Sequence, residues 1–203
     1  MSIRKGTDWG RPGAVPDGAI FVNNDAEANE AVSVSRRARR PVPPLCLLGG
    51  DLARTLGVAD NEGSLRAGEG THLKIDLGMA LVDGRLVWFV SHLLARRWWW
   101  RGPIVVAANA AFIGDYNVAP KAHPGDGRLD LIEADPSFSE RLKARSRLRS
   151  GTHVPHPQIK VRRCRAAQLE LTRPTPVVLD GISIGNAQTL SIRVEPEALD
   201  IWI

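Results

Sequence analysis

Glycine and proline interrupt this chain throughout its length, and this limits the folds that it can form. The sequence has 19 glycines and 14 prolines among 203 residues, so about one residue in six breaks regular secondary structure. Long uninterrupted helices need segments without these residues, which disfavours a helical bundle or a coiled coil. Short strands joined by turns tolerate them well. The pattern therefore favours a fold built mainly from short strands.

The remaining composition excludes several broad classes of protein. With 43% hydrophobic and 24% charged residues, the chain can bury a core and is not expected to be disordered. Its longest apolar run, 103–114, is interrupted by Asn109 and is shorter than the ~20 residues of a membrane span. The first 13 residues have no apolar core, so they do not predict a signal peptide. We expect a soluble, cytoplasmic protein.

Cysteine content and net charge say little about chemistry. Cys46 and Cys164 are too few for a disulfide scaffold or a cysteine-rich zinc site. His153 and His156 have no cysteine or carboxylate companions at metal-binding spacing, which argues against zinc. The net charge of +5 favours anionic partners such as nucleic acid, phospholipid or a phosphorylated substrate, without choosing among them.

The first third of the chain predicts a loop or arm over residues 1–18 and a small α/β unit over 19–70. Ala19–Asn23 is a short strand candidate, and Asp25 is a suitable N-cap for a helix that runs to the arginines at 36–40. Pro41 prevents this helix from continuing. A buried strand at Leu45–Leu48 then leads through a glycine turn into a short helix over 52–56.

Residues 71–203 have a different texture and predict a β-sandwich or barrel. Val82–Arg85 is a hairpin signal, and 137–148 is the one helical stretch. Together the two regions predict an α+β fold, with a small α/β part followed by a large β-sandwich. The expected strands are short and separated by Gly, Pro, Asp or Asn: 72–77, 81–90, 104–108, 116–119, 129–133, 159–163, 167–171, 177–180, 189–195 and 199–203.

Four segments, in the same order, resemble motifs of the diacylglycerol kinase-like lipid kinases of the soluble bacterial type. Val118–Asp130 resembles the family segment APxAxPxDGxLDV, and Gly49–Val58 resembles GTGNDFARxLGI. Gly151–His153 matches the GxH turn, and Leu179–Gly181 resembles the LDG of LDGE. The resemblance covers roughly residues 19–203. It implies a diacylglycerol/NAD kinase-like fold, in which an α/β nucleotide domain precedes a β-sandwich and the active site lies between them.

Measured against this family, the phosphate-binding elements of the chain are altered. The phosphate loop GGDGT corresponds to residues 23–27, where Asp25 is kept, the glycines are lost and Glu27 replaces the threonine. A glutamate there would repel a phosphate, so the segment is better explained as a helix cap. In the second loop, Gly49, Gly50 and Arg54 are candidates for nucleotide binding, and a plain strand-to-helix turn is the alternative.

The catalytic base of the family is also missing. By resemblance, the Glu of LDGE takes the proton from the lipid hydroxyl, and this position is Ile182 here. Asp180, two residues away, and Asp51 are the candidate substitutes. An Asp-Gly pair at 180–181 also makes an ordinary turn, and we favour that interpretation of Asp180.

The metal motif is the best preserved of the family's elements. The resemblance implies a structural Mg²⁺ held by the carboxylate of Asp126 and by the backbone carbonyls of His123 and Arg128, a chemically reasonable set of hard oxygen ligands. The alternative is that 124–127 is simply a turn. ATP binding is not expected, because the glycine loop is lost.

Two surface features suggest partners. Residues 92–101 combine Trp98–Trp100 with three arginines, which suggests a homo-oligomer interface first and membrane contact second. Five cations between Arg141 and Arg149 suggest a solvated helix face, with a contact to anionic lipid headgroups as the alternative. No nucleic-acid-binding motif is present, so we expect no nucleic-acid partner.

Two functions remain from the sequence. We favour a divergent, non-catalytic relative that acts as a binding or structural module, because three elements that work together in catalysis are altered. The alternative is a small ATP-dependent lipid kinase that phosphorylates a diacylglycerol-like hydroxyl and uses Asp180 or Asp51 as its base.

Overall fold

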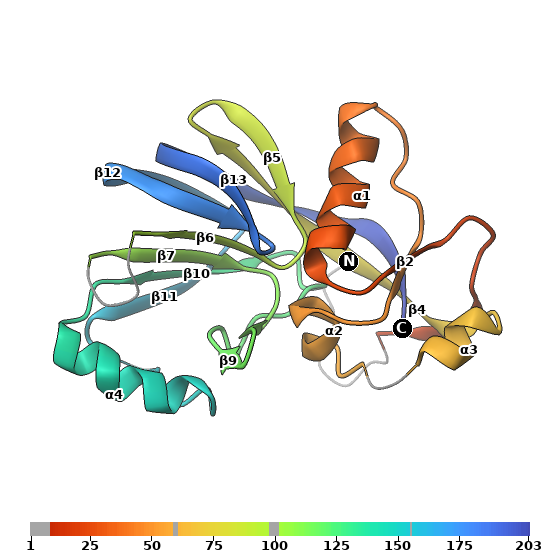
Figure 1. The fold of residues 1–203 in the computed structure, drawn as a ribbon, viewed down its shortest axis with the longest axis horizontal. Helices are drawn as coiled ribbons and strands as arrows, with labels where there is room; N and C mark the ends of the chain where they lie inside the picture. The colour runs from red at the N-terminus through yellow and green to blue at the C-terminus, as the bar shows by residue number, and fades with distance from the viewer. Residues whose placement is uncertain (1–8, 59–60, 98–101, 155) are drawn as a thin grey trace.

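The structure is a computed structural model that describes residues 9–58, 61–97, 102–154 and 156–203. Figure 1 shows a β-rich fold with its helices at the periphery. The helices of the described residues are α1 (Asp25–Arg37), α2 (Asp51–Thr55), α3 (Glu62–Arg66) and α4 (Phe138–Leu148). The strands are β1 (Arg11–Ala14), β2 (Ile20–Val22), β3 (Leu45–Leu47), β4 (Glu69–Val82), β5 (Arg85–Phe89), β6 (His92–Arg96), β7 (Ile104–Ala108), β8 (Phe112–Ile113), β9 (Tyr116–Asn117), β10 (Leu129–Ala134), β11 (Ile159–Cys164), β12 (Ala166–Leu179) and β13 (Ile182–Trp202).

Eleven of these strands form one continuous sheet that folds over on itself. Its main order is β1-β4-β13-β12-β6-β7-β10-β11, with β5 on the edge of β4 and with β2 and β3 joined through β13. In Figure 1, β5, β12 and β13 lie above β6, β7, β10 and β11. Alternating side chains such as Phe89, Leu93, Leu131 and Leu190 are buried between these layers, as expected for a β-sandwich.

The α/β part sits at the other end of the same sheet. β2 and β3 run parallel, and β3 also pairs in parallel with the end of β13, where Leu45 and Cys46 lie beside Ile201 and Trp202. A second apolar core joins this part to the sandwich and includes Val32 of α1, Leu52 of α2 and Ile75 of β4. The prediction of an α+β fold with a small α/β part and a large β-sandwich is confirmed.

Helix α1 begins one residue earlier than the sequence predicts. Asn24 is its N-cap, and the Asn24 side chain accepts a hydrogen bond from the Glu27 backbone N–H at 2.9 Å. Asn and Asp are both suitable caps by residue type, and the prediction of Asp25 is wrong by one position. The side chain of Asp25 is instead used by helix α2, as described below.

Most of the predicted strands are present with other bounds, and strands β6 and β8 were not predicted. Residues 11–14, predicted as a loop, form β1 and pair with β4. The predicted strands 167–171 and 177–180 fall in one strand, β12, and 189–195 and 199–203 fall in β13 with an irregularity between Glu195 and Leu199. Pro174 lies in β12 between Glu170 and Thr175, where the register with β13 shifts, and Pro176 is paired with Asn186. None of the helices in the described ranges is both long and apolar enough to cross a bilayer.

Candidate functional site

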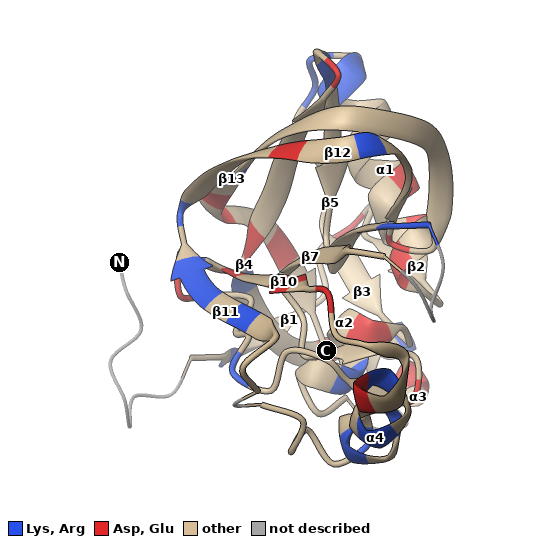
Figure 2. Ribbon diagram, turned by 90° about the vertical axis from the view of Figure 1, so that its left-hand side faces the viewer, with Lys and Arg blue, Asp and Glu red and all other residues tan. Residues whose placement is uncertain are grey.

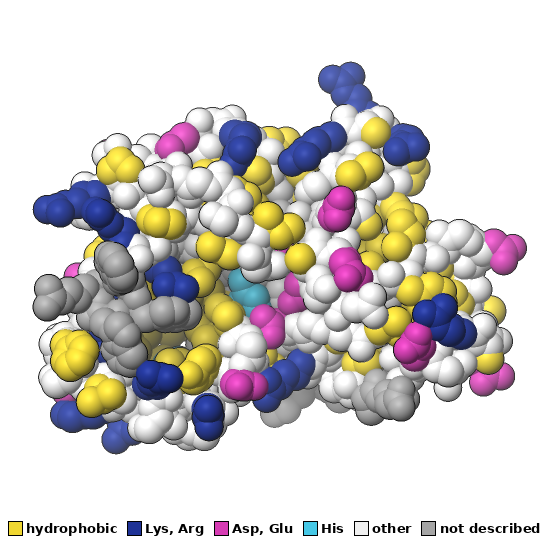
Figure 3. All heavy atoms as spheres, in the orientation of Figure 1, with side chains coloured by type: hydrophobic (Ala, Val, Ile, Leu, Met, Phe, Trp, Pro, Cys, Tyr) yellow, Lys and Arg dark blue, Asp and Glu magenta, His cyan; other side chains and the backbone are white. Residues whose placement is uncertain are grey.

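The α/β part meets the sandwich where the first residues of α1 and α2 face the turns after β5 and β12. We call this region the junction and define it by Asp25, Asn29, Asp51, Asp180 and the backbone of residues 90–92. Figure 3 shows a histidine and several acidic side chains together in the middle of this face, between the two parts. Both predicted catalytic residues, Asp51 and Asp180, lie in this region, where the charge of Asp25 acts on each of them.

Asp25 caps helix α2 although it belongs to α1. Its buried carboxylate accepts hydrogen bonds from the backbone N–H groups of Asp51 at 2.8 Å and Leu52 at 3.2 Å. These are N–H groups of the first turn of α2, which have no partner within the helix. Burial raises the pKa of Asp25, and the hydrogen bonds from the backbone N–H groups of Leu52 and Asp51 oppose that rise.

The two predicted nucleotide-binding glycines allow α1 to approach α2 this closely. A Cβ on Gly49 would lie 2.5 Å from the carbonyl oxygen of Asn23, and one on Gly50 would lie 2.5 Å from Oδ1 of Asp25. Gly50 also has φ +101, a conformation that side-chain-bearing residues rarely adopt. Packing against Asn23 and Asp25 thus accounts for both glycines.

The backbone that corresponds to the family's phosphate loop is likewise satisfied from within the chain. The carboxylate of Glu27 accepts hydrogen bonds from the backbone N–H of Asn23 at 2.7 Å and from the side-chain amides of Asn23 and Asn24. These bonds lower the pKa of Glu27, with the Asn23 N–H as the main cause. A carboxylate thus occupies a backbone donor of this segment, which is consistent with its interpretation as a helix cap.

The side chains of Asp51 and Arg54 both form hydrogen bonds with the backbone of Gly114, in the turn between β8 and β9. Oδ1 of Asp51 accepts a hydrogen bond from the Gly114 N–H at 2.8 Å, and the Arg54 guanidinium donates to the Gly114 carbonyl at 2.6 Å. Arg54 also stacks over the Phe112 ring at 4.3 Å. Burial and the negative charge of Asp25 raise the pKa of Asp51 to about 6, while the Gly114 hydrogen bond and Arg54 oppose this. A half-buried carboxyl of this kind is a candidate proton acceptor.

Asp180 is buried and fully engaged with its neighbours. Oδ1 accepts hydrogen bonds from the backbone N–H groups of Ser91 and His92, each at 2.8 Å. Oδ2 accepts from the Val90 N–H at 2.8 Å and from the Asn29 side-chain amide at 2.7 Å. Residues 180 and 181 do form the turn that we favoured, but the Asp180 carboxylate also ties together three separate segments of the chain.

Burial is the main cause of the pKa shifts of Asp180 and His92. It raises the pKa of Asp180 to about 7, with the charge of Asp25 adding to the rise and the hydrogen bonds from Asn29, His92 and Val90 opposing it. It lowers the pKa of His92 to about 4, so the ring is neutral near pH 7. His92 Nε2 lies 3.0 Å from the carbonyl oxygen of Ala110, which requires this nitrogen to carry the proton.

Ile182 lies outside this arrangement. It starts β13 on the far side of the 180–181 turn, pairs with Leu179, and is 40% exposed. Because the chain turns at Asp180, the two side chains do not share one face of an extended strand. A role for Asp180 as a substitute base stays a prediction.

The predicted metal residues are brought together in the turn before β10. Oδ1 of Asp126 accepts a hydrogen bond from the Arg128 N–H at 3.0 Å, and the His123 carbonyl lies 3.4 Å from the Asp126 N–H. The His123 ring packs beside Trp9 with their centroids 4.6 Å apart. The other Asp126 oxygen contacts the Arg163 guanidinium. This contact does not fit a divalent cation on the same oxygen, and Mg²⁺ binding stays a prediction.

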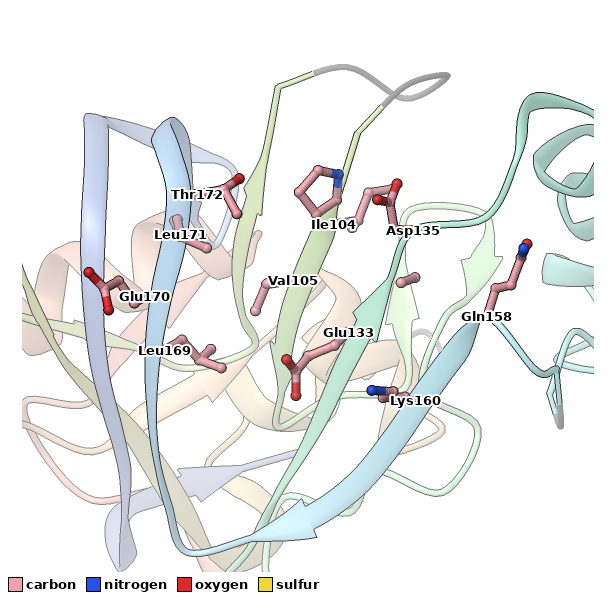
Figure 4. A pocket seen from close by; sticks show the side chains of 12 residues that line it. Ile104, Val105, Glu133, Asp135, Gln158, Lys160, Leu169, Glu170, Leu171 and Thr172 are labelled. Atoms are coloured by element: carbon pink, nitrogen blue, oxygen red, sulfur yellow. The ribbon is translucent and has the colours of Figure 1, made fainter.

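A cavity of about 370 Å³ opens between the layers of the sandwich, away from the predicted site residues. Figure 4 shows Leu169 and Leu171 of β12 on one side and Val105 of β7 on the other. Glu133 and Lys160, which lie opposite each other on β10 and β11, also line it. No sequence pattern predicts this cavity, because its lining comes from strands β7, β10, β11 and β12 and from residues beside them.

Trp98–Trp100 lie outside the described residues, so the oligomer interface expected there stays a prediction.

Two residues that face the junction, Asn29 and His92, were not predicted as site residues from the sequence. The Asn29–Glu30 pair resembles the NEV motif of the family, and this is the signal from which Asn29 could have been found.

Comparison with known proteins gives a consistent result. Residues 82–203, more than half of the chain, match the family described as the YegS C-terminal NAD kinase beta sandwich-like domain. No curated protein matches the chain. Two solved structures from Bacillus anthracis str. Sterne, named as diacylglycerol kinases, superpose on 90% of the chain. One has 15% identity, a TM-score of 0.68 and 76% of its own length covered, and the other has 14%, 0.61 and 74%. At these identities the superpositions establish a shared fold.

Proposed function

Since the chain belongs to the diacylglycerol kinase-like family through its YegS C-terminal NAD kinase beta sandwich-like domain, we propose that it is a divergent member without ATP-dependent lipid phosphorylation. On this proposal it acts as a binding or structural module. The observation that carries the proposal is the Asp25 carboxylate on the backbone N–H groups of Asp51 and Leu52. The start of α2 is where a nucleotide phosphate would need those donors.

Further features support this proposal. Glu27 occupies the Asn23 N–H in the same way, so two anion-binding backbone positions already hold carboxylates of the chain itself. A bound phosphate would have to displace these carboxylates and approach their negative charge. Asp180 uses both oxygens for backbone and Asn29 hydrogen bonds, and Ile182 has no group that accepts a proton.

Calorimetric titration with Mg-ATP tests this proposal, with Mg²⁺ alone as the control. We expect no saturable heat with Mg-ATP, and no phosphatidic acid above a protein-free blank when diacylglycerol micelles and labelled ATP are supplied. Saturable nucleotide binding would overturn the proposal, because it would mean that the carboxylates leave the N–H groups.

The alternative, a small lipid kinase, is favoured by one observation. Asp51 is half-buried and its pKa of about 6 suits a general base near neutral pH. If phosphate transfer to diacylglycerol occurs and is lost in Asp51→Asn, this alternative is correct. The Asn side chain can still accept the Gly114 hydrogen bond, so the variant removes the base and keeps the local contact.

We also propose an anionic lipid surface as the partner of helix α4. Its inner face is anchored by Arg141, whose guanidinium donates to the carbonyls of Pro136 and Gly102 and pairs with Asp135. Its outer face exposes Phe138 and Leu142, and Figure 2 shows the helix at the periphery of the molecule with its basic residues in blue. Apolar side chains beside cations suit a phospholipid interface better than a nucleic-acid backbone. The exposed cations of this helix and its C-cap are Lys143, Arg145, Arg147 and Arg149. A homo-oligomer and the lack of a nucleic-acid partner stay predictions.

A further inference from the structure

Three aspartates lie in or beside the turn before β10. Asp126 lies within the turn, Asp130 follows it on β10, and Asp76 of β4 lies directly behind it. Asp130 is 2% exposed and Asp76 is fully buried. Carboxylates placed this way need a compensating positive charge or hydrogen-bond donors.

Asp76 is compensated by backbone donors. Its carboxylate accepts hydrogen bonds from the Gly127 N–H at 2.6 Å and the Glu197 N–H at 3.0 Å. Its own N–H donates to the Pro124 carbonyl at 2.6 Å. These bonds hold the turn against β4 and β13 and leave Asp126 and Asp130 as the pair that needs a cation.

That cation is the guanidinium of Arg163. Arg163 lies on β11 directly opposite Asp130 in the antiparallel ladder. Its Nε is 3.2 Å from Oδ1 of Asp130, and its terminal nitrogen contacts Oδ2 of Asp126. The same nitrogen lies 3.5 Å from the carbonyl oxygen of Lys121. One planar group thus bridges the turn, its preceding segment and the first strand after it.

We propose that Arg163 replaces a divalent cation at this turn, so that the fold is complete without a metal. A guanidinium remains charged at every physiological pH and presents several donors in a fixed plane, which suits two carboxylates at once. It is also attached to the chain, so it does not dissociate when free cation is scarce. The inference is independent of the proposed function, because it concerns the stability of the turn and not nucleotide binding.

Thermal unfolding in EDTA and in millimolar MgCl₂ tests this inference. We expect the wild-type Tm to be the same in both solutions. Arg163→Gln leaves Asp130 buried without its cation and should lower Tm by roughly 10 °C in EDTA, with MgCl₂ restoring part of the loss. The matched control is Arg162→Gln, which removes the same charge from the next residue of β11, where Arg162 lies 3.6 Å from Glu133 at the surface. It should change Tm little.

Two more variants keep the test decisive if Arg163→Gln does not fold. Arg163→Lys retains one charge but cannot bridge two carboxylates in the same way, and its Tm should be intermediate. Adding Asp130→Asn to Arg163→Gln removes the uncompensated buried charge and should recover part of the Tm. A wild-type Tm that falls in EDTA and rises with MgCl₂ would overturn the inference, as would equal losses in the 162 and 163 variants.

Discussion

Asn29 and Asp180 are 151 positions apart in the chain and share a hydrogen bond of 2.7 Å between Nδ2 and Oδ2. Asn29 also donates to the Trp88 carbonyl at 2.8 Å, and Asp180 accepts from the backbone of residues 90–92. Together the two side chains fasten helix α1 to the turns after β5 and β12. The acidic residue that could have replaced the family's base is thus committed to holding the two parts of the molecule together.

Asp180→Ala should cost about 3–5 kcal/mol of unfolding free energy, because it leaves three backbone N–H groups and the Asn29 amide without their buried acceptor. Asp83→Ala is a matched control. Asp83 also starts an Asp-Gly turn, has positive φ, and accepts from the backbone of Gln188 and Thr189, but at an exposed position where water can replace it. Urea denaturation of both variants measures the difference. Equal losses would contradict the role assigned to Asp180.

The pH dependence of stability should change in Asp51→Asn. The folded-state pKa of Asp51 is raised from 3.8 to about 6, so the folded protein holds this proton more tightly than the unfolded chain. Its contribution to stability is present below about pH 4 and is lost as the pH rises to about 6. Between these values the wild type should lose unfolding free energy relative to Asp51→Asn, and above them the difference should be constant. Urea denaturation of both proteins at several pH values measures it, and parallel profiles would contradict it.

Gly50→Ala should destabilise the protein by about 2–4 kcal/mol, since the new Cβ meets Oδ1 of Asp25 and the backbone has positive φ. Gly57→Ala is the comparison. Gly57 also has positive φ, at +73, but a Cβ there has open space around it, so only the backbone term of about 1 kcal/mol applies. Thermal unfolding separates the two. If both variants lose the same stability, the contact with Asp25 is not what requires glycine at position 50.

Helix α4 should determine binding to anionic vesicles. We expect the protein to sediment with phosphatidylglycerol-containing vesicles and not with phosphatidylcholine vesicles, and binding should weaken with salt. Substituting Arg145, Arg147 and Arg149 by Gln should reduce binding at least about tenfold.

The control for the vesicle experiment removes three charges from another surface. Arg37, Arg39 and Arg40 are exposed at the end of α1, and their replacement by Gln changes the net charge by the same amount. Equal loss of binding in the two triple variants would show a general charge effect and would contradict a specific role for α4. Binding to a single-stranded oligonucleotide in place of vesicles would contradict the choice of partner.

Local sequence signals predicted the local features of this fold well. The glycine turn at 49–50, the prolines after α1 and the Val82–Arg85 hairpin each depend on a few neighbouring residues, and all lie where expected. The same signals could not separate Asn24 from Asp25 as the cap of α1, because both residue types cap helices. Only the position of α2, 26 residues further along the chain, determines that Asp25 faces the second helix.

The candidate site was harder to predict, because its contacts join distant segments. The Asp-Gly pair at 180–181 and the one at 83–84 look alike in sequence, and one carboxylate is buried while the other is exposed. Likewise, Arg162 and Arg163 are adjacent cations, and only the register of β10 with β11 places Arg163 opposite Asp130. Charge and residue type alone do not distinguish the members of such pairs.

Strand β13 affects how the molecule unfolds and whether its two parts can be produced separately. It pairs with β12 and β4 within the sandwich and then with β3 of the α/β part, so a single strand belongs to both parts. A fragment of residues 71–203 produced alone would lack the β3 neighbours of Ile201 and Trp202. The edge of a buried strand would then be exposed, which favours aggregation. We therefore expect the full chain to unfold in one step, and its halves to be poor candidates for separate expression.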